Sequence, residues 1–349
     1  MCIGLIALSS ASSYTALISE NNSNYYFIRQ LAFAVIGVIA MFVISTIDYK
    51  LYEKFGYIIF FVALATMLMV FIPGLGSTVK GARRWIDLGF ISFQPSELMK
   101  PALAIGIAAY ISKKNIKPHN ILGYIVPVCM ILIVCVVMYF QSHMSGAIIM
   151  IVIGAVTIFT SGFKLKKRTV ILICITVVLA AALFLFTSDY RMERVKAFFN
   201  PDLDITGSNW QPTQSLYAIG SGGLFGTGIG QSRQKYLWLP ESQNDFVFSI
   251  YAEEFGFIGC TVVVALFMLF ISRLVSLVLK TKDLFGLMIS AGIISMFAFQ
   301  IIMNIAVVTK LIPTTGMPLP FFSYGGTSLL INLASIGIVL NVTRQRRAS

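Results

Sequence analysis

The sequence predicts an all-α, polytopic membrane protein with about ten transmembrane helices, the first one truncated, and a large extracytoplasmic loop between helices 7 and 8. Three observations predict this class. The 349 residues are 57% hydrophobic and 11% charged, whereas a soluble domain carries roughly 25% charged residues. Apolar runs long enough to span a bilayer recur along the chain. One polar segment, 188–245, is rich in Gly and Pro and interrupts these runs.

Apolar runs of about 17–25 residues are typical of transmembrane helices. They predict nine full helices, at 27–47, 56–74, 97–112, 120–140, 144–162, 169–187, 246–272, 284–309 and 325–343. The opening segment Met1–Ser13 is also apolar but too short to cross alone, and it lacks the basic start of a signal peptide. We expect it to be the remaining part of a tenth helix. The whole chain, 1–349, is then one transmembrane domain with the loop 188–245 inside it.

The basic residues predict the orientation. Fifteen of the 26 Lys and Arg residues lie in every second short connection, which marks that side as cytoplasmic. Both termini are then cytoplasmic. The loop 188–245, the connection Pro73–Pro95, the turn near Gln141–Ser145 and the segment Leu311–Ser323 lie outside. Because the net charge of +12 is spread over short loops between apolar spans, it indicates a membrane protein that contacts lipids rather than a partner of nucleic acid.

Cysteine and histidine give no metal site. The five cysteines lie in apolar segments without a CxxC pair, which favours small buried hydrophobic side chains over a disulfide or a metal site. His119 and His143 are too few and too far apart in the sequence for a histidine-based site. The sequence therefore leaves the identity of any bound metal unknown.

Three acids mark the end of the long loop and the helix that follows it. Asp245 lies at the outer start of that helix, where an aspartate either caps the helix or serves as a general base at the membrane boundary. The residues alone leave these two roles about equally supported. Glu253 and Glu254 lie two turns deeper, where a carboxylate is functional or paired. We expect a basic residue of a neighbouring helix to pair with at least one of them.

A second group of polar residues lies at 81–101. Glu97 and Lys100 are spaced to pair across one helical turn, and Ser96 is placed to cap the helix start after Pro95. One interpretation is a capped, self-neutralised helix end. The other is an anion site, because helix N-termini and arginines both suit phosphate. Arg83 and Arg84 could equally bind lipid head groups.

Two glycine-rich segments remain. The run Gly220–Gly230 has neither a following Gly-Lys-Ser/Thr nor a βαβ context, so it is not a nucleotide motif. Its glycines could let the backbone approach a pyrophosphate, or permit tight turns and close helix contact. The segment Gly316–Gly326 is an outer, re-entrant-like turn of the kind that lines a cavity.

Taken together, the motifs resemble the SEDS family (shape, elongation, division and sporulation), which includes FtsW, RodA and SpoVE. The resemblance covers essentially the whole chain, in the expected order. The matching strings are GARRWIDLGFISFQPSELMK at 81–100, YRMERVKAFFNP at 190–201, QSLYAIGSGGLFGTGIG at 214–230, LPESQNDFVFSIYAEEFGFIG at 239–259 and GMPLPFFSYGGTS at 316–328. GLIALSSASS at 4–13 looks like the end of the family's first helix.

The resemblance implies a ten-helix enzyme that polymerises glycan strands from lipid II at the outer face of the cytoplasmic membrane, together with a class B penicillin-binding transpeptidase. The family's essential outer-loop aspartate falls on Asp245. Its QPSE-x-x-K element falls on Gln94, Pro95, Ser96, Glu97 and Lys100, and its GxRRW element on Gly81, Arg83, Arg84 and Trp85. The chain departs from the family pattern at its short first helix and at His143, where many members have an aspartate.

The implied reaction is glycosyl transfer with a lipid pyrophosphate leaving group. Asp245 is the expected base, and positive charge must stabilise the departing group. The expected substrate-binding residues are Arg83, Arg84, Gln94, Ser96, Glu97, Lys100, Arg191, Arg194, Gln214, Ser215, Lys235 and Ser323. A divalent cation, Mg²⁺ or Mn²⁺, is a candidate aid, and no organic cofactor is expected.

Two other functions fit a ten-helix chain with buried acids. A lipid II flippase needs polar groups along the whole path, whereas here they concentrate on the outer side. A scaffold for the transpeptidase would not need so elaborate a loop, although that role can coexist with catalysis. The role in division, elongation or sporulation stays open.

Overall fold

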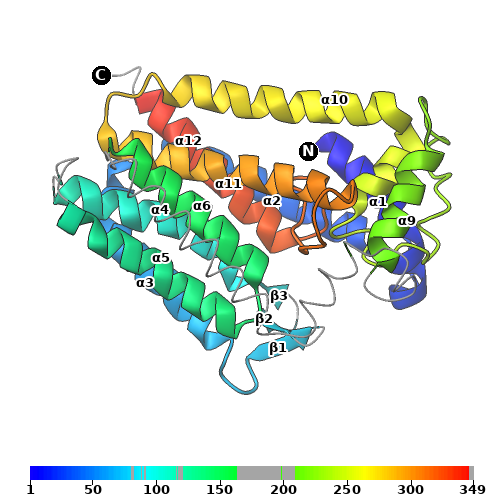
Figure 1. Cartoon of the computed structure of the whole chain (residues 1–349), viewed down its shortest axis with the longest axis horizontal. Helices are drawn as coiled ribbons and strands as arrows, with labels where there is room; N and C mark the ends of the chain where they lie inside the picture. The colour runs from blue at the N-terminus through cyan, green and yellow to red at the C-terminus, as the bar shows by residue number, and fades with distance from the viewer. Residues whose placement is uncertain are drawn as a thin grey trace. The chain divides into compact units, whose positions relative to one another are not determined.

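The computed structural model describes residues 1–79, 82–87, 89, 92–114, 116, 121–162, 198 and 209–345 and is mostly helical (Figure 1). Its α-helices are α1 (Cys2–Glu20), α2 (Tyr25–Thr46), α3 (Lys50–Met69), α4 (Pro95–Lys113), α5 (Ile125–Phe140), α6 (Met144–Thr160), α9 (Trp210–Ser221), α10 (Val247–Val278), α11 (Leu284–Val308) and α12 (Gly326–Gln345). A short 3₁₀ helix, Ile121–Tyr124, precedes α5. Six helices are long and apolar enough to cross a membrane: α1, α2, α3, α10, α11 and α12.

Helices are found at the predicted spans wherever the structure describes them, although α4, α5 and α6 are not among the six that are long and apolar enough to cross a membrane. Most boundaries differ by a few residues, but α3 begins at Lys50, six residues before the predicted start, and α10 ends at Val278, six residues after the predicted end. The first helix corrects the sequence expectation, because α1 continues beyond Ser13 to Glu20 and its 19 residues reach spanning length. The helix predicted at 169–187 lies outside the described residues.

A small antiparallel sheet was not predicted from the sequence. Its strands β1 (Gly76–Val79), β2 (Ala82–Asp87) and β3 (Ser92–Phe93) are hydrogen-bonded in the order β1-β2-β3. Gly76 pairs with Ile86, which in turn pairs with Phe93. The sheet joins the end of α3 to the start of α4 and orders a connection that the sequence assigned to an outer loop.

The described residues fall into two compact units, each built from separated stretches of the chain. One comprises 1–26, the described part of 164–263, and 302–323; the other comprises 27–163, 264–301 and 324–349, again where described. In the second unit α3, α4, α5 and α6 lie side by side (Figure 1). Gly56 lies against Ala109, and Gly106 against Phe60 and Met130. Small residues thus let these helices approach closely, as is usual in membranes.

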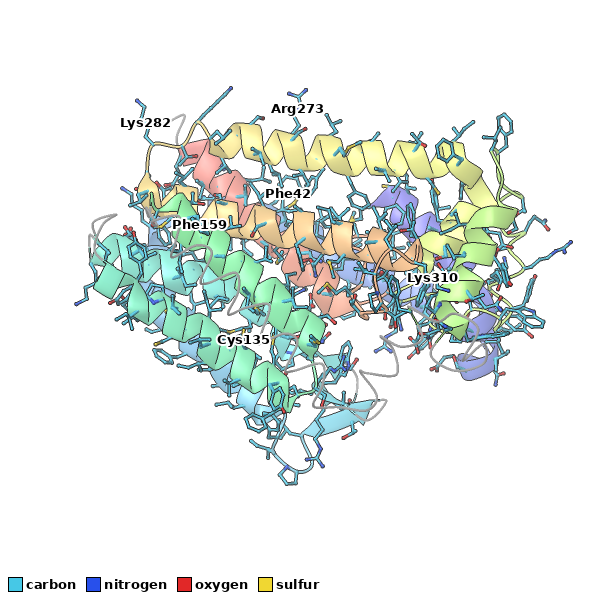
Figure 2. The ribbon with its side chains drawn as sticks, viewed as in Figure 1. Phe42, Cys135, Phe159, Arg273, Lys282 and Lys310 are labelled. Atoms are coloured by element: carbon cyan, nitrogen blue, oxygen red, sulfur yellow. The ribbon has the colours of Figure 1, made fainter. Side chains whose placement is uncertain are left out.

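Helix α4 is the most enclosed element of the second unit. Almost every residue from Pro95 to Ile111 is buried. The faces of α2, α3 and α5, by contrast, expose large apolar side chains such as Phe42, Phe61 and Leu132, as expected for surfaces that meet lipid. Figure 2 shows Arg273 and Lys282, near the end of α10 and before α11, projecting away from the helices.

In the first unit, α10 is broken near its N-terminal end. Gly256 has φ 65° and ψ −167° inside the helix, a conformation open to glycine. The helix α9, which the sequence did not predict, lies within the long loop and contacts α10 through a hydrogen bond between Ser215 and Ser249, 2.7 Å apart. Cys2 and Cys129 are exposed rather than buried, and the four described cysteines are free thiols.

Candidate functional site

Asp245 lies in the turn before α10, two residues ahead of the first helical residue, Val247. Its side chain is half-buried. The carboxylate lies beside the backbone of the 309–325 segment, since a Cβ atom on Gly316 would be 3.4 Å from Oδ2. Gly316 itself has φ +69°. The aspartate is partly exposed, and a side chain at position 316 would be in van der Waals contact with its carboxylate.

Asn304 of α11 fixes the backbone on both sides of this carboxylate. Its Nδ2 donates to the carbonyl of Asp245 at 2.8 Å and to the carbonyl of Met317 at 2.8 Å. Sequence reasoning missed Asn304, although a buried amide inside an apolar span is a signal of function or pairing. Asn304 is a positioning residue, because it acts on Asp245 through the main chain.

Ser323 and Ser215 are buried in the same unit. Ser323 Oγ accepts a hydrogen bond from the N–H of Leu319 at 2.8 Å, which closes the turn at the end of the 309–325 segment. Ser215 Oγ donates to the carbonyl of Val308 at 2.6 Å, and Gln214 beside it is also buried. These contacts join α9, α10 and the end of α11. The predicted contact of these three residues with substrate stays a prediction.

The glycine run packs against the break in α10. In an unbroken helix the N–H groups of residues 257 and 258 would bond the carbonyls of residues 253 and 254. Here each of these groups bonds the loop instead. The four bonds are Thr227 N–H to Glu253 O (2.9 Å), Gly228 N–H to Glu254 O (3.0 Å), Phe257 N–H to Gly223 O (2.9 Å) and Ile258 N–H to Leu224 O (3.1 Å).

Close backbone contact explains the glycines at this junction. A Cβ atom on Gly226 would clash with the Glu254 carbonyl, and one on Gly256 would clash with the Gly226 amide. The loop therefore satisfies backbone groups that the break in α10 leaves without helical partners. The structure thus shows the glycines of Gly220–Gly230 in close contact with a helix, one of the interpretations that the sequence allows.

Glu253 and Glu254 bind the segment 230–235 that follows. Glu253 accepts hydrogen bonds from the Ser232 hydroxyl and from the N–H of Arg233 at 3.0 Å. Glu254 accepts from the hydroxyl of Ser10 in α1 and pairs with Lys235, whose Nζ lies 3.6 Å from Oε1. The expected pairing of one acid is thus found, but the partner comes from the loop rather than from a neighbouring helix.

Lys235 is almost fully enclosed by this arrangement. Its ammonium also donates to the Gly230 carbonyl at 2.6 Å, and the side chain is 6% exposed. These contacts hold the loop to α10 and, through Ser10, to α1. The predicted contact of Lys235 with substrate stays a prediction, and its ammonium already has three protein oxygens as neighbours.

In the second unit, the start of α4 carries the other predicted group. Gln94 is the N-cap residue and Pro95 is the first helical residue, the position at which proline is favoured. The expectation that Ser96 caps α4 is therefore wrong, and its hydroxyl is buried without a partner among the described residues. The predicted pair is confirmed, with Lys100 Nζ 2.7 Å from Glu97 Oε1. Ser328 of α12 donates to Glu97 Oε2 at 2.8 Å.

Arg83 and Arg84 lie on β2. Arg83 is exposed, whereas Arg84 donates from Nη2 to the carbonyl of Ser142 at 2.9 Å. His143, next to Ser142, is buried. Burial, together with Arg84 and Lys100, lowers the pKa of His143 to about 3. A neutral imidazole therefore stands where the resemblance led us to expect an aspartate.

Two predicted residues, Arg191 and Arg194, lie outside the described residues, as does Gly81. Among the described part of the chain, no three His, Cys, Asp or Glu side chains come together to hold a metal ion. The first unit thus contains Asp245, Gln214, Ser215, Lys235 and Ser323. The second contains Arg83, Arg84, Gln94, Ser96, Glu97 and Lys100.

The family model for FtsW, RodA and SpoVE, described as a cell cycle protein, matches residues 1–348. The chain belongs to the FtsW/RodA/SpoVE family. Family membership and the apolar helices make it a multi-pass membrane protein. Stage V sporulation protein E of Bacillus subtilis is 40% identical over 99% of this chain and 94% of the relative. The probable peptidoglycan glycosyltransferase FtsW of Trichlorobacter lovleyi is 38% identical over 97% and 89%.

Two solved structures match the fold over nearly the whole chain. One, described as "Structural coordination of polymerization and crosslinking by a peptidoglycan synthase complex", has a TM-score of 0.78 and 27% identity, covering 99% of this chain and 98% of the other. The rod shape determining protein RodA of Thermus thermophilus matches with a TM-score of 0.68 and 27% identity over 99% and 96%.

Proposed function

We propose that this protein is a peptidoglycan glycosyltransferase that polymerises lipid II into glycan strands at the outer face of the cytoplasmic membrane. The observation that carries the proposal is Asp245: a half-buried carboxylate in the turn before α10, with its main-chain carbonyl held by Asn304 and its Oδ2 beside the glycine at position 316. Relatives named as probable peptidoglycan glycosyltransferases, similar over nearly the whole chain, support the substrate class.

In the proposed reaction, Asp245 accepts the proton of the acceptor sugar's 4-hydroxyl. The oxygen forms a bond to the anomeric carbon of the donor, the bond from that carbon to the phosphate oxygen breaks, and undecaprenyl pyrophosphate leaves. Direct displacement inverts an α-linked donor into a β-linked product. General base catalysis of this kind contributes typically about 10²–10⁴-fold to the rate.

The departing pyrophosphate needs positive charge. Arg83 is exposed, and Lys100 is paired with Glu97, so Arg83 is the better placed of the two to meet an anion directly. A divalent cation is part of the proposal only as an aid that binds oxygens of the substrate. The described residues gather no cluster of three acidic, Cys or His ligands for it, and no step is routed through it.

The proposed partner is a class B penicillin-binding transpeptidase that crosslinks the strands as they form. A structural relative described as coordinating polymerisation and crosslinking in a peptidoglycan synthase complex supports a protein partner of this kind. The proposed orientation has both termini in the cytoplasm and Asp245 outside. It rests on the basic residues of alternate short connections.

A lipid II flippase is the second candidate. Ser290 and Gln300 of α11 and Asn332 of α12 are buried and each has a side-chain oxygen without a hydrogen-bond partner among the described residues. Polar groups inside a helix bundle are typical of a transport path. These three buried polar groups support translocation more strongly than the acids of the long loop do.

One pair of assays separates the two functions. The purified chain is reconstituted in vesicles with lipid II, with and without the transpeptidase, and both glycan polymer and lipid II transfer between leaflets are measured. Polymer from the chain supports the glycosyltransferase. Transfer between leaflets without polymer, even with the transpeptidase present, would replace the proposal with the flippase.

A further inference from the structure

The helix α9 exposes its large apolar side chains and buries polar ones. Its buried residues are Pro212, Gln214, Ser215 and Ala218, while the large side chains of Leu216 and Tyr217 are exposed, Tyr217 by 61%. A water-exposed helix normally buries its apolar residues and exposes its polar ones. Exposed Leu216 and Tyr217, next to buried Gln214 and Ser215, instead suit contact with an apolar medium.

The glycine loop after α9 continues this exposed apolar surface. Leu224 is 62% exposed, Phe225 is 79% exposed and Ile229 is 64% exposed. The sequence has no charged residue from Ile205 to Ser232, although this stretch belongs to the loop that composition assigns to the water phase. Clustered exposure of large apolar side chains marks a surface that binds something.

The position of the loop identifies what covers it. Its backbone bonds to α10 at the break, directly beside Phe257 and Ile258. Phe257, Ile258 and Val262 are exposed on the outside of a membrane helix, so the loop tip extends the lipid-facing side of α10. Figure 1 shows α9 beside the start of α10.

The length of α10 indicates how deep in the bilayer the glycine loop lies. Between Glu254 and Arg273 the helix has 18 residues without charge, about 27 Å at a rise of about 1.5 Å per residue. This length matches the hydrocarbon core of roughly 30 Å. Glu254 therefore lies at one edge of the core, and the loop bonded to it lies at the same level.

We propose that residues 216–229 form an interfacial anchor that inserts into the surface of the bilayer. Tyr217, Leu224 and Phe225 lie among head groups and upper acyl chains, at a depth of about 5–10 Å as for interfacial helices. Because the segment has no charge, its insertion depends on apolar burial and not on anionic lipid. The anchor sets the height of the loop that leads to Asp245, and it does not depend on the proposed reaction.

Collision accessibility of a spin label measures the depth. In a cysteine-free version of the full chain, reconstituted in neutral phosphatidylcholine vesicles, a nitroxide is attached at Phe225→Cys. Gln231→Cys, exposed in the same loop beyond the anchor, is the matched control. Val262→Cys on α10 is the lipid reference.

We expect the label at 225 to collide readily with oxygen and poorly with a water-soluble nickel chelate, as at 262, while the label at 231 shows the opposite. Equal access of nickel at 225 and 231 would overturn the proposal by placing the loop in water. Exclusion of both reagents at 225 would also overturn it, in favour of a covering protein surface such as a second copy. If the cysteine-free chain does not fold, a photoreactive side chain at 225 in the native chain gives the same decision: lipid adducts support the anchor, and adducts to protein alone contradict it.

Discussion

His143 is a buried ring placed next to cations, and this sets its ionisation. Burial, Arg84 and Lys100 lower the pKa of His143 to about 3, against about 6.5 in an unfolded chain. The native protein therefore keeps the ring neutral while the unfolded chain takes up a proton. Above pH 6.5 this residue has no effect on stability, and below it each unit of pH favours the unfolded state.

We predict that His143 makes the protein lose stability between pH 6.5 and pH 3. At pH 5 its contribution to the loss is about 2 kcal/mol, from one protonation 1.5 units below the unfolded pKa. Thermal unfolding at pH 7.5 and pH 5 measures the effect, with His143→Gln as the comparison. The carboxyl groups are the same in both proteins, so the difference between the two isolates the effect of His143. The account of His143 is wrong if the variant loses as much stability as the wild type.

Lys235 and Glu254 form a buried ion pair, so removing one charge leaves the other without compensation. We predict that Lys235→Met costs about 3–5 kcal/mol of unfolding free energy, and that Lys235→Met combined with Glu254→Gln costs less than Lys235→Met alone. Denaturant unfolding of the two single variants and the double variant measures the coupling. An additive result would show that the two charges do not interact.

The same variants test the role of Lys235. If the ammonium serves only the loop, KM for lipid II in the folded fraction stays that of the wild type. A raised KM in the absence of any stability loss would instead make Lys235 the substrate contact that the sequence predicts.

At the scale of elements, four backbone hydrogen bonds join the glycine loop to the break in α10. Gly226 and Gly228 both have positive φ, +82° and +103°, but only Gly226 has backbone in the place of a Cβ atom; the nearest atom at Gly228 is the flexible side chain of Gln231 at 3.6 Å. The two positions therefore share the cost of left-handed backbone and differ in packing.

We predict that Gly228→Ala destabilises the protein by about 1–2 kcal/mol, the cost of a left-handed conformation for a residue with a side chain. Gly226→Ala must also separate the loop from the Glu254 carbonyl, so it costs more. Thermal unfolding of the two variants measures the difference. Equal losses would mean that the loop does not pack on the break.

The long apolar helices were predictable because each is a run of apolar residues long enough to cross a bilayer. The short elements were not. β3 has two residues and β1 four, too few to show the alternation that identifies a strand. The helix α9 lies in a loop that composition marks as polar, and its exposed Leu216 and Tyr217 do not form the pattern of a water-soluble helix.

The candidate site was predictable where the partners are close in sequence. Glu97 and Lys100 are one turn apart, so their pairing follows from helix geometry. Asn304 contacts Asp245 across 59 positions, and Ser10 reaches Glu254 across 244. No local pattern carries such contacts. The local sequence around Asp245 supports a helix cap and a general base equally. Only the family resemblance favours the role of general base.

For the whole molecule, one aspartate carries the proposed function. The two compact units each draw on three separated stretches of sequence, so a substitution that unfolds either of them would also abolish activity. The decisive variant must therefore remove the carboxylate and leave the fold intact. Asp245→Asn is the variant of choice, because it keeps the main-chain carbonyl to which Asn304 donates.

We predict that Asp245→Asn reduces the rate of lipid II polymerisation by about 10²–10⁴-fold while its thermal unfolding stays that of the wild type. Glu241→Gln is the matched control, because Glu241 lies in the same turn and its bond to Asn244 can persist in the amide. The measurement is the rate of glycan polymer formation from lipid II by the purified chain with its transpeptidase. A folded Asp245→Asn variant that polymerises at the rate of Glu241→Gln would contradict the account.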